Sequence, residues 1–179
     1  MEKKIFEELN WAFKKAASDF NYREINDTCL PNLLFFCKEN LESANEIIEK
    51  WAKANDVNFI VIDGNDQSVI RKAKKIATIG HLIKDYIAPT AEQIEKLNQP
   101  NTILFLKNLD KMEDKKYRRW LFDFMNELIV ADDSKEEGYT FAKNMLFVVA
   151  TVGEMQGRDA FEMCTMDAKD AFAHIMLDK

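Results

Sequence analysis

The chain has 179 residues, of which 47% are apolar and 31% charged, with only five Gly and three Pro and a formal net charge of −6. This composition is typical of one helix-leaning globular domain and excludes fibrous and low-complexity classes, while the negative charge argues against broad attraction to phosphate backbones. Residues 1–8 carry charges where a signal peptide needs an apolar run, and no stretch reaches membrane-spanning length, so we expect a cytoplasmic protein.

Cysteine and histidine spacing predicts no metal site. The three cysteines, Cys29, Cys37 and Cys164, form no CxxC pair, and only two histidines are available. Free buried thiols are the simpler interpretation. Neither His81 nor His174 lies in a recognisable nucleophile context, and both are read as structural.

The chain opens with an amphipathic helix. Apolar residues recur at helical spacing within residues 1–27, at Ile5, Leu9, Ala12, Phe13, Ala16 and Phe20. We therefore divide the chain into an N-terminal helical segment, 1–27, and an α/β core, 28–179. The apolar face of the first helix must pack against something, either the core or an interface.

Strands and helices alternate through the core. Continuous apolar runs predict buried strands at 31–37, 57–63, 102–106 and 144–150, with a last strand at 173–177. Helices are predicted at 42–54, 68–83, 91–98, 113–130 and 168–172, and a polar exposed loop at 131–138. This alternation predicts a three-layer αβα domain around a mainly parallel, five-stranded sheet.

The order and spacing of these elements resemble the core of AAA+ P-loop ATPases over about residues 28–177. The resemblance implies a P-loop NTPase (AAA+-like) sheet, and the family's small helical lid domain has no counterpart within this sequence. A flavodoxin-like or other doubly wound sheet is the alternative fold. Strand order separates the two, because AAA+ cores insert strands between the first strand and its successor in sequence.

The phosphate-loop motif of the family is degenerate here. The family pattern is G-x-x-x-x-G-K-[ST], in which glycines let backbone amides cradle phosphates and the lysine supplies charge. The segment between Cys37 and Glu46 has the family's length, and alignment places the motif from Lys38 to Asn45. Lys38 and Ser43 then replace the two glycines, Ala44 replaces the lysine, and Asn45 replaces the Ser/Thr.

The family's metal and water-positioning residues are also missing. Its third strand ends in Asp-Glu, which the resemblance aligns with Lys107 and Asn108, and only the outer Asp110 keeps a carboxylate. Thr151 is a weak substitute for the polar residue of the sensor strand. The stretch 166–172, which resembles the one that often carries an arginine finger, contains no Arg.

These losses predict an inactive AAA+-like domain with no catalytic residue and no bound cofactor, acting as a structural or regulatory subunit that binds another protein or itself, including AAA+-type subunits. The alternative is a nucleotide-binding ATPase in DNA replication or remodelling, in which Lys38 or Lys107 replaces the missing lysine and holds ATP with Mg²⁺. Under either hypothesis, the net negative charge argues against nucleic acid as the partner, and two local basic stretches, at 71–75 and 115–119, are where a nucleic acid or an acidic partner would bind.

Two further features favour structural interpretations. Trp11, Trp51 and Trp120 all fall on predicted helices, where core positions are the better prediction because large aromatics dominate core packing. Residues 63–66, Asp-Gly-Asn-Asp, leave a predicted strand at the carboxyl edge where open α/β sheets bind ligands. A turn is the simpler account of this segment.

Overall fold

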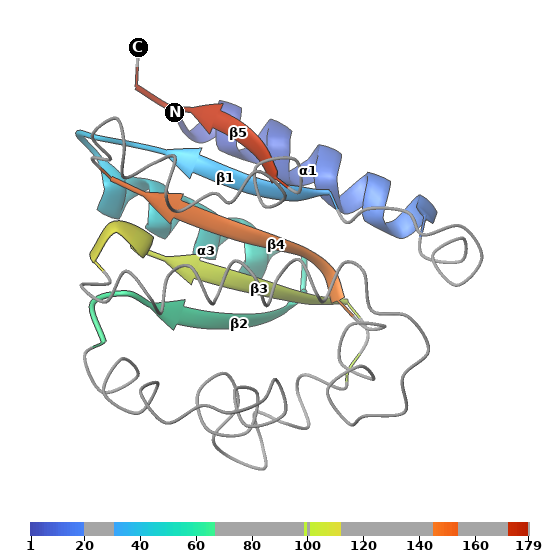
Figure 1. Ribbon diagram of the computed structural model, residues 1–179. Helices are drawn as coiled ribbons and strands as arrows, with labels where there is room; N and C mark the ends of the chain where they lie inside the picture. The colour runs from blue at the N-terminus through green and yellow to red at the C-terminus, as the bar shows by residue number, and fades with distance from the viewer. Residues whose placement is uncertain (20–30, 67–98, 100, 112–144, 154–171, 179) are drawn as a thin grey trace.

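The computed structural model describes residues 1–19, 31–66, 99, 101–111, 145–153 and 172–178 (Figure 1). These residues form two α-helices, one short 3₁₀ turn and a single sheet of five strands. The elements in chain order are α1 (Glu2–Asp19), β1 (Asn32–Phe36), α3 (Leu41–Ala54), β2 (Asn58–Asp63), β3 (Thr102–Lys107), η2 (Leu109–Lys111), β4 (Met145–Val152) and β5 (Phe172–Met176).

All five predicted strands are confirmed, within two residues at each end. The predicted helix at 42–54 is also confirmed, as α3. The other helices predicted in the core, at 68–83, 91–98, 113–130 and 168–172, and the polar loop at 131–138, lie outside the described residues.

The sheet is entirely parallel and has the strand order β2-β3-β4-β1-β5. β4 and β3 therefore lie between β1 and its successor in sequence, β2 (Figure 1). A flavodoxin-like sheet would place β1 and β2 side by side, so this order excludes that alternative. It is the order expected from the resemblance to AAA+ cores.

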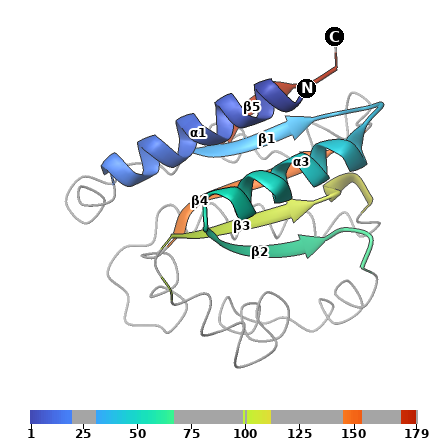
Figure 2. The same ribbon diagram turned by 180° about the vertical axis from the view of Figure 1, so that it is seen from behind.

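Helices α1 and α3 cover one face of the sheet (Figure 2). The apolar stripe of α1, formed by Ile5, Leu9, Ala12 and Ala16, is fully buried in the same core as the helix-facing residues of β1 and β4. The stripe of α1 is therefore core rather than interface. A hydrogen bond from Lys50 Nζ to Glu2 Oε1, 2.6 Å long and exposed, also connects the two helices.

The opposite face of the sheet is buried as well. Side chains alternate along a strand, so Leu34, Leu104, Leu106 and Val148 point away from the helices, and all four are 1% exposed or less. Burial on both faces is the reason these strands read as continuous apolar runs. The segments predicted to form the second helical layer lie outside the described residues.

Tryptophan placement corrects one prediction. Trp51 is fully buried, as predicted, but Trp11 is 49% exposed and lies off the buried stripe of α1, with Lys15 Nζ 5.6 Å from its ring centroid. Helical periodicity, rather than residue type, decides this position. Trp120 lies outside the described residues.

Neither described helix is long and apolar enough to cross a membrane.

Candidate functional site at the carboxyl edge of the sheet

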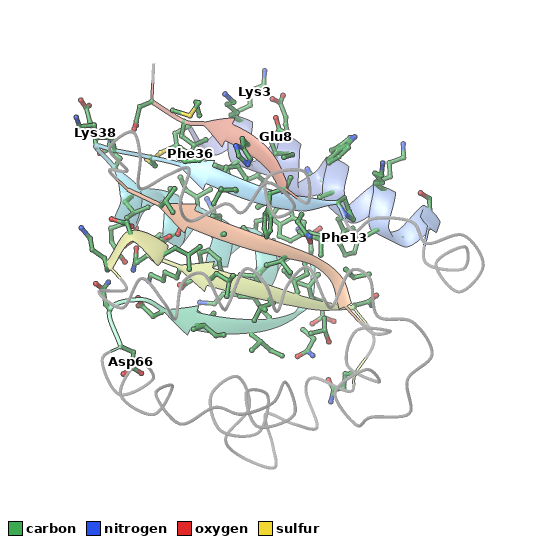
Figure 3. All side chains as sticks on the ribbon, in the orientation of Figure 1. Lys3, Glu8, Phe13, Phe36, Lys38 and Asp66 are labelled. Carbon is green, nitrogen blue, oxygen red and sulfur yellow. The ribbon has the colours of Figure 1, made fainter. Side chains whose placement is uncertain are left out.

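The parallel strands end at one common edge, where open α/β sheets usually bind ligands. Figure 3 labels Lys38, just beyond β1, and Asp66, just beyond β2, at this edge. The candidate phosphate-loop and metal-binding positions all lie here, so the fold brings together the residues that the sequence comparison selected.

The loop after β1 is shorter than the predicted eight-residue motif. β1 ends at Phe36 and α3 already begins at Leu41, so only Lys38, Glu39 and Asn40 of the aligned positions lie in the loop. Ser43, Ala44 and Asn45 belong to the first turns of the helix. The prediction of a loop with the family's length is therefore wrong. A helical backbone bonds its own amides within the helix after the first turn, which leaves fewer of them to surround a phosphate.

A buried ring of hydrogen bonds joins α3 to the ends of β3 and β4. Asn45 Nδ2 donates to Asn108 Oδ1 at 2.7 Å, and Thr151 Oγ1 donates to Asn45 Oδ1 at 2.7 Å. The backbone N–H of Asn108 donates to Thr151 Oγ1 at 3.1 Å, which closes the ring. The three residues are at most 2% exposed.

The ring extends to the end of β2. Asn108 Nδ2 donates to Asp63 Oδ1 at 3.0 Å, and the same oxygen accepts the N–H of Asn65 at 2.8 Å. The N–H of Asp66 donates to the carbonyl of Asp63 at 3.0 Å, so the segment 63–66 is a turn, as predicted. We call Asn45, Asp63, Asn108 and Thr151 the Asn108 network.

The backbone at Asn108 supports its central position. Its φ is 57°, in the left-handed region that Asn tolerates better than most residues. Asn108 is the first residue after β3, and its left-handed backbone turns its side chain toward Asn45 and Asp63. The position that the sequence resemblance aligns with the water-orienting Glu of AAA+ ATPases is thus occupied by an uncharged side chain bonded to two neighbours.

Lys107 is held by two carboxylates of α3. Its Nζ lies 3.3 Å from Glu42 Oε1 and 3.4 Å from Glu49 Oε1, and its side chain is 15% exposed. Burial lowers the pKa of the ammonium, but hydrogen bonds and attraction from Glu42 and Glu49 outweigh it, so the pKa lies above its ordinary value. The lysine proposed to replace the missing phosphate-loop lysine therefore already has two anionic partners.

Replacing Lys107 with methionine should lower the free energy of unfolding by about 1 kcal/mol at pH 7, because both glutamates are partly exposed and solvent screens them. A raised folded-state pKa means that this contribution is present below the ordinary pKa of 10.5 and is lost as the pH rises through the higher folded value. Urea unfolding between pH 7 and 11 should show the wild type losing stability more steeply than the variant above about pH 10.5.

Lys53→Met is the matched control, since Lys53 is an exposed lysine in the last turn of α3, the helix that carries Glu42 and Glu49. If the two variants had the same pH dependence, the ion pairs of Lys107 would contribute nothing to stability.

Asp110, which the resemblance aligns with the outer Asp of the third-strand segment in AAA+ ATPases, also has bonding partners. Its Oδ1 accepts the N–H of Gly153 at 3.0 Å, and its Oδ2 lies 3.4 Å from Lys111 Nζ, with the side chain 8% exposed. A Cβ added at Gly153 would meet Asp110 Oδ2 at 2.9 Å. Asp110 thus ties η2 to the end of β4. Within the described residues, no group of three or more His, Cys, Asp or Glu could hold a metal ion.

Cys37 and His174 both contact neighbouring side chains of the fold. Cys37 is buried and unbridged, as predicted, and burial together with the nearby Asp178 carboxylate raises the pKa of its thiol, although a backbone hydrogen bond from Asn40 opposes this. The ring of His174 packs against Phe36 with centroids 5.6 Å apart. His81, Cys29, Cys164 and both basic stretches lie outside the described residues.

The sequence reasoning did not predict the contacts of four residues of the site. Glu42 and Glu49 stand seven residues apart on one helix, a spacing that places both carboxylates on one face and could have revealed them as a pair of anions. Asp63 was read only as part of a turn. Asp178 carries no local signal, because its contacts with Cys37 and Lys38 arise from the pairing of β5 with β1.

Comparison with known proteins gives similarity at the level of structure. No family model matches the chain, and no curated protein matches it. A chain in the structure of Drosophila ORC bound to DNA is similar over 99% of this chain and 93% of that chain, with 14% sequence identity and a TM-score of 0.51.

Two further solved structures have lower scores. A chain of Drosophila ORC bound to AT-rich DNA and Cdc6 has 14% identity and a TM-score of 0.47, over 99% of this chain and 56% of that one. A chain from the crystal structure of Rif2 in complex with the C-terminal domain of Rap1 has 11% identity and a TM-score of 0.43, over 99% and 59%.

The first of these similarities shows the fold. The chain has an α/β fold with an all-parallel sheet of order β2-β3-β4-β1-β5, and this fold resembles that of the matched chain of Drosophila ORC. At 14% identity, the similarity carries no information about individual site residues.

Proposed function

We propose that this chain is a catalytically inactive AAA+-like domain that serves as a structural or regulatory subunit and binds another protein. The observation that carries the proposal is the Asn108 network. At the positions that the resemblance aligns with the phosphate-loop Ser/Thr, the water-orienting Glu and the sensor residue of AAA+ ATPases, this chain has Asn45, Asn108 and Thr151, whose buried polar groups bond one another.

The electrostatics of the edge support the same function. Among the described residues, seven carboxylates lie at or beside this edge, against the ammonium groups of Lys38, Lys107 and Lys111; they belong to Glu39, Glu42, Glu49, Asp63, Asp66, Asp110 and Asp178. A triphosphate would have to approach this excess of negative charge, and Lys107, which is partly buried, is already paired with two glutamates. ATP hydrolysis requires a phosphate loop, a metal ligand and a water-positioning group acting together.

A protein partner is the binding class that fits such a domain. Without nucleotide chemistry, the domain offers a parallel sheet with α1 and α3 packed on one face. Another protein can bind the surface of this packed unit. The ORC chain that it resembles supports AAA+-type subunits as the partner class, by analogy of fold.

Isothermal titration of the purified chain with Mg-ATP and with ADP, together with a phosphate-release assay, tests the absence of nucleotide chemistry. We expect no binding tighter than about 1 mM and no release above the buffer rate. An active P-loop ATPase assayed in parallel provides the positive control. Micromolar binding of Mg-ATP or ADP by the wild-type chain would overturn the proposal. Native mass spectrometry of the chain purified from its source tests the protein-binding part separately, because it detects a bound partner whether or not nucleotide binds.

A further inference from the structure

A carboxylate of the chain itself lies against the loop after β1. The backbone N–H of Lys38 donates to Asp178 Oδ2, and Asp178 Oδ1 lies 3.6 Å from Cys37 Sγ. Lys38 is the first position of the aligned phosphate-loop motif. The loop amide nearest to the sheet is therefore bonded to an anion.

The fold holds Asp178 in this place through the strand that precedes it. β5 pairs with β1 up to Phe36 and Met176, and the N–H of Leu177 then donates to the carbonyl of Phe36 at 2.9 Å. Lys4 Nζ, from α1, donates to the carbonyl of Met176 at 2.7 Å. The residues directly before Asp178 are thus fixed both by the sheet and by α1.

The amide that Asp178 occupies is the first one beyond the sheet. The N–H of Cys37 still donates to the carbonyl of Val152 at 2.9 Å, as a continuation of the pairing between β1 and β4. The next amide, that of Lys38, lies between the end of the strand and the start of α3, where backbone N–H groups of parallel α/β sheets commonly bind anions. A carboxylate satisfies such a donor in the same way as a phosphate oxygen does.

We propose that Asp178 blocks an anion-binding position of the loop: its carboxylate occupies the backbone amide of Lys38 and excludes phosphate groups from it. The inference rests on the proposed function and adds a cause for it, since the loop is closed by the protein's own anion as well as being degenerate in sequence. Removing the carboxylate should therefore expose a phosphate-binding amide, without restoring hydrolysis.

The test uses the full ¹⁵N-labelled chain titrated with inorganic pyrophosphate, and it follows the amide signal of Lys38. Asp178→Ala should bind pyrophosphate about tenfold more tightly than the control variant Glu7→Gln, the effect of one hydrogen bond to a charged group. Glu7 is an exposed carboxylate on α1, paired only with Lys3 in the described contacts, so its substitution changes the net charge equally. Asp178→Asn keeps an uncharged acceptor of the same size and should show a smaller gain.

Each result decides the matter. If the Lys38 amide signal shifts in Asp178→Ala, yet pyrophosphate binds no better than to Glu7→Gln, the contact is only a structural tie and the inference is wrong. The same conclusion follows if binding tightens but the Lys38 signal does not respond to pyrophosphate. Should Asp178→Ala fail to fold, Asp178→Asn against Glu7→Gln carries the comparison. Tight Mg-ATP binding by the wild type would instead count against the proposed function, so the two failures are distinguishable.

Discussion

Replacing Asn108 with alanine is expected to lower the free energy of unfolding by about 3 to 4 kcal/mol, one of the two largest effects predicted for this chain. The substitution leaves Asn45 Nδ2 without its acceptor and removes a donor from Asp63, in surroundings where Asn45 is fully buried. It also places alanine at a φ of 57°, which disfavours a Cβ-bearing residue without a compensating polar contact. Urea unfolding monitored by circular dichroism gives the value.

The chain contains a matched control for the backbone part of this effect. Asn101 also has a positive φ, of 63°, but it is exposed and lies outside the Asn108 network. Asn101→Ala should cost about 1 kcal/mol. A similar cost for both alanine variants would mean that the network adds nothing to stability.

Asn108→Gly separates the two contributions at the same site, because glycine adopts this φ without strain. The glycine variant should still lose about 2 kcal/mol, through the unpaired partners. Full stability of Asn108→Gly would show that the asparagine serves the backbone conformation only, and the interpretation of the site as a self-satisfied network would fail.

Replacing Trp51 with alanine should lower the free energy of unfolding by about 4 kcal/mol, the usual range for a fully buried large aromatic. Trp51 connects three elements: its ring lies 5.8 Å from that of Phe13 on α1 and 6.4 Å from that of Phe147 on β4, and its Nε1 donates to Asn10 Oδ1 at 2.8 Å. Removing it opens a cavity where α1, α3 and the sheet meet. Far-UV circular dichroism in urea measures the loss without depending on tryptophan fluorescence.

Trp11→Ala is the natural comparison, since the same substitution is made on an exposed side chain. It should change stability by less than about 1 kcal/mol. Trp51→Phe keeps most of the apolar volume but loses the hydrogen bond to Asn10, and should fall between the two alanine variants. Equal losses for Trp11→Ala and Trp51→Ala would contradict the packing of α1 described here.

The sheet could be predicted from sequence because the apolar character of its residues indicates that they are buried. The runs Leu33–Phe36 and Ile103–Leu106 are apolar at successive positions, which only a strand covered on both faces requires. The placement of Trp11 could not be predicted from its residue type, because its position relative to the stripe of α1 decides its exposure. The family's motif spacing likewise suggested a long loop where α3 begins at Leu41.

The site was predictable as a set of positions but not as a set of contacts. Lys107, Asn108 and Asn45 were selected by their alignment with catalytic positions, and the structure brings them to one edge. Their partners come from segments far apart in the chain, and no local pattern indicates that Thr151 closes the ring or that Asp63 extends it. Hydrogen bonding between distant segments depends on strand order, which the sequence predicted only by resemblance.

The position of β1 inside the sheet has a consequence for how the chain acquires its structure. Both neighbours of β1 come from the last part of the sequence, with Leu33 opposite Val149 and Leu34 opposite His174. During synthesis, this apolar strand must therefore wait, unpaired on both edges, until β4 and β5 have left the ribosome. Pairing over such sequence distances is slow, so β1 stays exposed to aggregation until residues 145–176 have been made.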